Sequence, residues 1–211
     1  PWGLGILCAM QGRTAEARAA FEKGASMAAE QGNHWAWFEC LSRLSMLDLA
    51  GGNLAAVEER NSQLCDVAEK LGEGSERAWA ATLLALARRQ AGDNGARLEE
   101  ALTELRAADS KGLLACALVE AGCQDLANGH TAEAINRADE ALAAADDVGR
   151  FHQYDRAMML KARAALLSAD EETTEQYLQW LATRIRNLSP DLSIHGALCQ
   201  LREDIIQTKE Q

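Results

Sequence analysis

Glycine recurs along this chain at a nearly fixed interval, and that interval constrains the fold more than any other feature of the sequence. Five small residues stand 40, 40, 37 and 39 residues apart, each in a polar or small-residue break: Gly12, Gly52, Gly92, Gly129 and Ser168. A second set follows twenty residues or so behind each of the first four: Gly32, Gly72, Gly112 and Gly149. Self-similarity at a fixed period predicts an array of repeated supersecondary units.

The two glycine registers divide the chain into ten segments that each show helical periodicity. Glycine can take the left-handed conformation that closes a helix, so the second register is expected to end helices. Candidate N-caps precede several segments: Thr14, Ser75, Thr131, Asp170 and Ser189, the last followed by Pro190. We therefore expect five hairpins of a helix A and a helix B, which bury their apolar faces only by stacking on their neighbours.

Composition agrees with an all-α fold that has no sheet. Hydrophobic residues make up 48% and charged residues 25%, only two prolines occur, and the helix formers Ala, Leu, Glu and Gln dominate. The net charge of −11 and the scattered basic residues disfavour binding to nucleic acid or anionic lipid. The longest nearly apolar stretch, residues 78–87, is about half of what spanning a bilayer requires.

The hairpins resemble the tetratricopeptide repeat. In that repeat helix A carries Leu-Gly-x-x-Tyr, a glycine follows, and helix B places Ala, an aromatic residue and Ala at fixed steps. The first repeat has Leu4, Gly5, Cys8, Gly12, Ala17, Phe21 and Gly24 at these positions, and the fourth has Ala121, Gly122, Asp125, Gly129, Ala134, Ala138 and Ala141. The fifth repeat matches in part, through Leu160, Ser168 and Tyr177, and the second and third are degenerate. An amphipathic bundle with Ala and Leu at helical spacing is the alternative.

A period near 40 makes the array similar to a subclass, the C-terminal helical-repeat regions of bacterial signalling ATPases. These include LuxR-type, maltose-activator-like transcription regulators and AAA-type regulators fused to nucleotide cyclases. The resemblance implies a right-handed superhelix of about five hairpins over residues 1–189, with a C-terminal capping helix over 190–211. Because Trp2 to Cys8 already reads as helix A, we expect a fragment of a larger protein whose first repeat is truncated.

The resemblance also implies a concave groove lined by helix A. Counting back from each turn glycine predicts the partner-binding residues to be Trp2, Ile6, Met10, Glu39, Met46, Trp79, Thr82, Leu86, Arg89, Val119, Leu126, Asp155 and Met158. This largely apolar set suits an amphipathic helix or an extended peptide, and it lacks the basic cluster that clamps a C-terminal carboxylate. In the alternative, these side chains pack on one another or another part of the chain fills the groove.

No catalytic motif of the common nucleotide-binding, zinc-protease or serine-hydrolase classes is present, so we expect no enzyme, no cofactor and no metal site. The four histidines fall near segment starts or turns, where solvated or capping roles are expected. The cysteines are interpreted as reduced core residues of a cytoplasmic protein, because most lie inside apolar helical patterns.

Taken together, these patterns predict a cytoplasmic interaction and regulatory module of a bacterial signalling or transcription-regulating protein. It would bind a protein or peptide segment and shift the equilibrium of an attached domain. It would not bind nucleic acid or membranes itself, and it could form a homo-oligomer. The alternatives are a receptor for a small peptide or sugar, with Glu39, Arg89 and Asp155 converging, and a passive oligomerisation scaffold.

Overall fold

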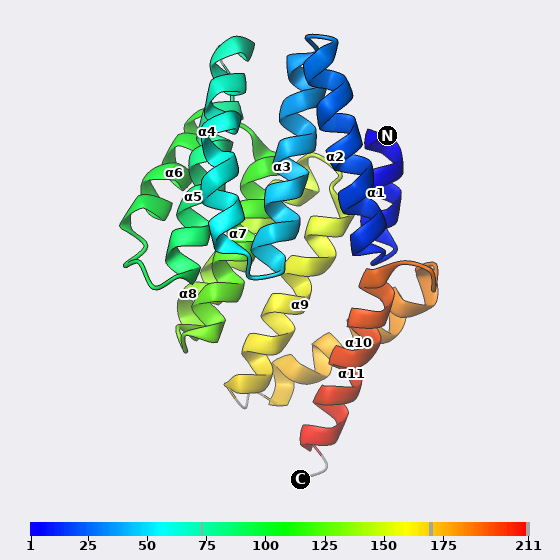
Figure 1. The fold of residues 1–211 in the computed structure, drawn as a ribbon. Helices are drawn as coiled ribbons and strands as arrows, with labels where there is room; N and C mark the ends of the chain where they lie inside the picture. Colours follow the sequence, from blue (N-terminus) through cyan, green and yellow to red (C-terminus); the bar gives the residue numbers. More distant parts are fainter. Residues whose placement is uncertain (73, 169–170, 210–211) are drawn as a thin grey trace. The chain divides into compact units, whose positions relative to one another are not determined.

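The computed structural model describes residues 1–72, 74–168 and 171–209, and these residues form eleven α-helices and no strand (Figure 1). The helices are α1 (Trp2–Met10), α2 (Thr14–Glu30), α3 (His34–Ala50), α4 (Leu54–Leu71), α5 (Glu76–Gln90), α6 (Ala96–Ala107), α7 (Lys111–Ala127), α8 (Thr131–Asp147), α9 (Phe151–Leu167), α10 (Glu171–Asn187) and α11 (Ser193–Lys209). The all-α prediction is confirmed. The superhelical path and the tetratricopeptide arrangement stay predictions.

The chain divides into two compact units, Pro1–Leu113 and Leu114–Gln211. In the first unit consecutive helices pack in order, from α1 on α2 to α5 on α6, and α3 also contacts α5. In the second unit α8 packs on α9, and α9, α10 and α11 all contact one another. Packing between sequence neighbours is what short turns between helices produce. None of the described helices combines the length and the hydropathy needed to cross a bilayer.

The turn glycines behave as predicted at all positions but one. Seven of the eight glycines in the two registers have φ between 62° and 106°, the left-handed region. The exception is Gly112, which lies in the first turn of α7, and the prediction that it ends a helix is wrong. Asp109 takes the left-handed conformation there instead, with φ of 49°. Aspartate tolerates this conformation because its short polar side chain can bond locally.

The predicted helix starts are less accurate. Thr14 and Thr131 are the first residues of α2 and α8 rather than their caps, and Ser75 precedes α5 without a capping side-chain bond. The start predicted at Ser189 is wrong because α11 begins at Ser193, and Asp170 lies outside the described residues. One cap was missed: Asn33 Oδ1 accepts a hydrogen bond from the Ala36 N–H at 3.1 Å.

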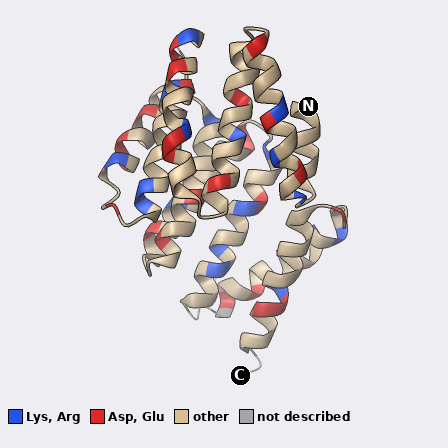
Figure 2. Cartoon of the chain, viewed as in Figure 1, with Lys and Arg blue, Asp and Glu red and all other residues tan. Residues whose placement is uncertain are grey.

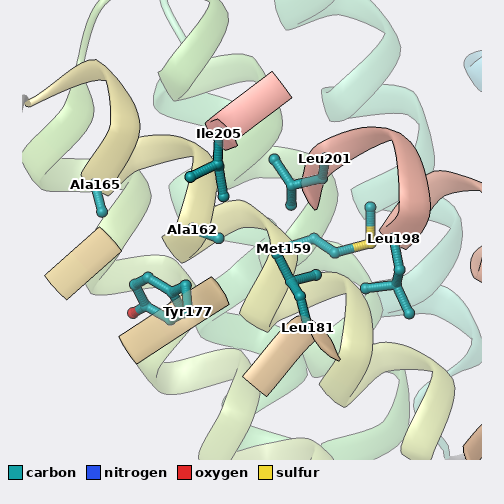
Figure 3. Packing of buried hydrophobic residues seen from close by; sticks show 8 residues of the cluster. All are labelled: Met159, Ala162, Ala165, Tyr177, Leu181, Leu198, Leu201 and Ile205. Carbon is teal, nitrogen blue, oxygen red and sulfur yellow. The ribbon is translucent and has the colours of Figure 1, made fainter. Parts of the chain in front are cut away.

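The last three helices enclose a core of their own in the second unit (Figure 3). Its buried members come from three elements: Met159, Ala162 and Ala165 of α9, Tyr177 and Leu181 of α10, and Leu198, Leu201 and Ile205 of α11. The α11 residues recur at three and four positions, so one stripe of that helix faces the hairpin. Helix α11 therefore covers the apolar side of α9 and α10.

Candidate partner-binding site

The residues predicted to line a groove have very different exposures. Five of them are buried: Trp79, Thr82, Leu86, Val119 and Asp155. Ile6, Glu39, Met46, Arg89, Leu126 and Met158 are partly exposed, and Trp2 and Met10 are exposed. The buried side chains present no surface to a partner in this structure. That all of these residues form one binding surface stays a prediction, because they are spread over both units.

Asp155 and Glu39, which were expected to converge on a small ligand, each lie beside an arginine. Both carboxylate oxygens of the buried Asp155 accept hydrogen bonds from Arg184, at 2.7 Å and 2.8 Å. Glu39 lies 3.6 Å from Arg43 on the same helix. Asp155 therefore joins α9 to α10 rather than lining a pocket for ligand. This bidentate pair was not predicted, because the two residues are 29 positions apart in sequence.

Buried acid and arginine pairs recur between helices, and sequence reasoning missed them. Asp48 of α3, which is 1% exposed, accepts from Arg18 of α2 and Arg60 of α4 at 2.6 Å each. Asp125 of α7 accepts from Arg137 of α8 at 2.5 Å. A signal was available: both aspartates stand four residues before a turn glycine, and Arg60 and Arg137 stand eight residues after it. These pairs hold helices together.

Burial and hydrogen bonding act on Asp48 in opposite directions. Burial raises the pKa of the Asp48 carboxyl, but the bonds and charges of Arg18 and Arg60 outweigh it, and the pKa lies below its ordinary value. Asp48 is therefore ionised at neutral pH and fully paired. Such a carboxylate is a structural anion, because both of its oxygens are bonded to arginines and its side chain is buried away from any partner.

The most accessible apolar surface of the first unit lies on α1. Four large side chains of this helix point to solvent: Trp2 (37% exposed), Leu4 (58%), Leu7 (50%) and Met10 (43%). Gly5 and Cys8 are the buried residues of α1. The helix has no charged side chain at all, as its uniform tan ribbon in Figure 2 shows. We call Trp2, Leu4, Leu7 and Met10 the α1 face.

Trp35, at the start of α3, extends the α1 face. Its side chain is 52% exposed, and its ring centroid lies 5.8 Å from that of Trp2 with an interplanar angle of 62°. Edge-on packing of two exposed tryptophans keeps both rings in one apolar patch. Trp2 and Met10 were predicted to lie in a binding site, whereas Leu4, Leu7 and Trp35 were not. The exposure of these three side chains depends on how the helices pack, and the spacing of apolar residues in the sequence does not predict that packing.

A concave surface lies between α5 and α6. It has a volume of about 1000 Å³, and small apolar residues such as Ala81, Ala85 and Ala101 are among those that line it. Charges of both signs line it, among them Arg88, Arg97, Glu100 and Glu104. Arg88 also pairs with Glu58 of α4 at 3.0 Å. Mixed, exposed charge at helical spacing is typical of a solvated helix surface, and this groove lacks the buried polar groups of a ligand pocket.

Comparisons with known proteins add no assignment. No protein-family model matches the chain, and no curated protein matches it. Among the side chains that the structure describes, no group of three or more His, Cys, Asp or Glu is placed to hold a metal ion. The α1 face is therefore the feature of the first unit that most clearly needs a functional explanation.

Proposed function

We propose that this chain is a protein-interaction module that binds an amphipathic helix of another protein on the α1 face. One observation carries the proposal: an uncharged helix exposes Trp2, Leu4, Leu7 and Met10 beside the exposed Trp35. Exposed apolar residues that lie singly need no explanation, but one uncharged helix with four large exposed apolar side chains beside a second tryptophan is typical of a protein-binding surface. Tryptophan and methionine are enriched at the centres of such interfaces.

The packing of the other helices indicates what kind of partner fits. Helix α3 packs between α2 and α4, and α5 packs between α4 and α6. In the first unit α1 packs on α2 and touches α3 through the two tryptophan rings. A helix bound on the α1 face would pack against α1 in the way that α2 packs against α3. The proposed partner segment is therefore a helix and not an extended strand.

The contact between α2 and α3 also indicates the composition of that helix. A methyl group added at Gly24 of α2 would lie 2.8 Å from the sulfur of Cys40 on α3, so the two backbones approach closely. The partner helix is expected to carry a stripe of small apolar residues at three- and four-residue spacing. The α1 face allows such an approach, because Gly3 has open space around it.

Net charge favours a different protein over a second copy of this chain. Two copies with a formal charge of −11 each repel one another, and the α1 face offers no charge to offset that repulsion. A partner whose helix is flanked by lysine or arginine would be attracted to the acidic chain. The resemblance to helical-repeat regions of bacterial signalling proteins supports a regulatory role, in which binding biases a domain attached to this module.

The proposal is tested with a peptide probe of defined sequence. A fluorescent peptide of residues 13–32, which contains α2 and its small-residue stripe, is extended by two C-terminal lysines and titrated with the full chain. We expect saturable binding, measured by fluorescence anisotropy. Leu7→Glu should weaken binding by at least about tenfold, because burying one leucine contributes roughly 1.5 to 3 kcal/mol and a tenfold change is 1.4 kcal/mol.

The matched control is Leu167→Glu, the same change at a leucine of α9 that is 68% exposed and lies in the other unit. It should leave binding unchanged. Absence of saturable binding, or equal binding by the wild type and Leu7→Glu, would sink the proposal. Sedimentation velocity of the chain alone adds a second check: a dimer that Leu7→Glu dissociates would assign the α1 face to self-association, as in a scaffold.

A further inference from the structure

A pocket in the second unit lies between α10 and α11 and has a volume of about 490 Å³. Helix α10 contributes Ala182, Ile185 and Arg186, and α11 contributes Cys199, Arg202 and Glu203. These positions recur at three and four residues on each helix, so one stripe of each helix lines the pocket. The pocket is independent of the α1 face and has a nucleophilic side chain in its wall.

His195 stands one helical turn before Cys199 and contacts it directly. The distance from Cys199 Sγ to His195 Nδ1 is 3.8 Å, within the range of a hydrogen bond to sulfur. A thiol can donate to an imidazole nitrogen, and the imidazole can then hold the proton while the sulfur reacts. Cys199 is half-buried, so its sulfur is supported by packing and still reachable through the pocket.

The charge of this pocket is opposite to that of the chain. The pocket is lined by two guanidinium groups, those of Arg186 and Arg202, and by one carboxylate, that of Glu203, in a protein of net charge −11. Arginines beside a pocket attract anionic reagents to it. Both arginines are exposed, so their charges are accessible to a small molecule that enters from solvent.

The other cysteines are in surroundings that oppose reaction. Cys8, Cys40 and Cys116 are buried. Burial, reinforced by a neighbouring acidic residue in each case, raises the pKa of the Cys40, Cys65 and Cys123 thiols above its ordinary value. Because the thiolate is the nucleophile, these thiols are poor nucleophiles at neutral pH. These five cysteines therefore serve as internal controls against which the reactivity of Cys199 can be compared.

We propose that Cys199 is a thiol-disulfide exchange site for small disulfides that carry carboxylate groups. Arg186 and Arg202 hold a carboxylate of the reagent, and His195 takes the proton of the Cys199 thiol. The Cys199 sulfur then attacks one sulfur of the small disulfide: a bond between these two sulfurs forms, the original disulfide bond breaks, and the departing thiolate receives the proton from His195. The products are a mixed disulfide on Cys199 and one free small thiol.

The experiment uses the reduced full chain and three probes of different charge: glutathione disulfide (anionic), 2-hydroxyethyl disulfide (neutral) and cystamine (cationic). Mass spectrometry of proteolytic peptides follows each cysteine with time. With glutathione disulfide we expect Cys199 to react about tenfold faster than any other cysteine. Arg186→Gln combined with Arg202→Gln should slow that reaction about tenfold and leave the reaction with the neutral probe unchanged.

His195→Gln should slow the reaction of Cys199 with all three probes, because it removes the proton acceptor but no charge that binds the reagent. Arg150→Gln, at an exposed arginine in the turn before α9, is the matched control and should react as the wild type does. Circular dichroism of every variant checks that α10 and α11 stay folded. The proposal is overturned if Cys199 reacts no faster than Cys65, or if folded arginine variants retain the wild-type preference for the anionic probe.

Discussion

Gly5 and Gly122 occupy equivalent places, seven residues before the glycine that ends helix A, and both are in close contact with another helix. A methyl group added at Gly5 would lie 2.5 Å from the ring of Phe21, and one added at Gly122 would lie 2.5 Å from Leu160 Cδ2. Phe21 and Leu160 are themselves buried and cannot move aside easily. At both glycines a side chain from another helix therefore packs directly against the backbone.

Gly5→Ala should destabilise the first unit, although alanine is the better helix former. Overpacking against Phe21 costs about 1 to 3 kcal/mol, and the gain in helix propensity is at most about 1 kcal/mol. Gly3→Ala is the matched control, because the same helix has open space at that position, and it should be neutral or slightly stabilising. Urea unfolding followed by circular dichroism measures both. Equal stability of the two variants would contradict the close packing of α1 on α2.

At the scale of helices, two ion pairs have the same spacing in sequence but opposite placement of the acid and the base. Arg18 of α2 pairs with Asp48 of α3, and Glu58 of α4 pairs with Arg88 of α5; both pairs are 30 residues apart. Each joins helix B of one hairpin to helix A of the next. If the hairpins packed in another order, an acid would face an acid, and the two like charges would repel. The exchanged charges therefore oppose packing of the hairpins in the wrong order.

Asp48→Asn should destabilise the first unit by about 3 kcal/mol at pH 7, the lower end for a buried ion pair that loses one partner, since Arg18 and Arg60 are partly exposed. The pKa of Asp48 is lowered by folding, so its contribution is present above the pKa of the unfolded state, about 3.9, and is lost as the pH falls below it. Urea unfolding at pH 7 and pH 3 should therefore show a smaller difference between variant and wild type at pH 3.

Asp139→Asn is the control for this prediction. Asp139 pairs with Lys161 at 2.5 Å, but its side chain is 54% exposed, so the change should cost less than about 1 kcal/mol. A loss at Asp139 as large as that at Asp48, or a loss at Asp48 that is the same at pH 3, would contradict the role given to the buried carboxylate.

At the scale of the whole chain, the sequence predicted the helices well, and the partner-binding role of the predicted groove residues stays a prediction. The glycine spacing located the turns because glycine adopts a left-handed conformation that other residues avoid. The spacing was wrong at Gly112, because Asp109 adopts that conformation instead. Trp79 and Leu86 were predicted to line a groove, but packing buries them, and periodicity cannot tell an inward from an outward apolar stripe. Leu4, Leu7 and Trp35 were missed for the same reason. The pairs of Asp48 and Asp155 depend on residues far apart in sequence.

Amide hydrogen exchange can locate the bound partner helix on the α1 face directly. The full chain is exchanged with and without a saturating amount of the peptide of residues 13–32 with its two added lysines, and protection is measured along the chain. We expect slower exchange in residues 5–13, whose backbone bonds belong to α1 and its turn, and no change in α10 or α11. Unchanged exchange in α1, with protection appearing only elsewhere, would contradict binding on the α1 face.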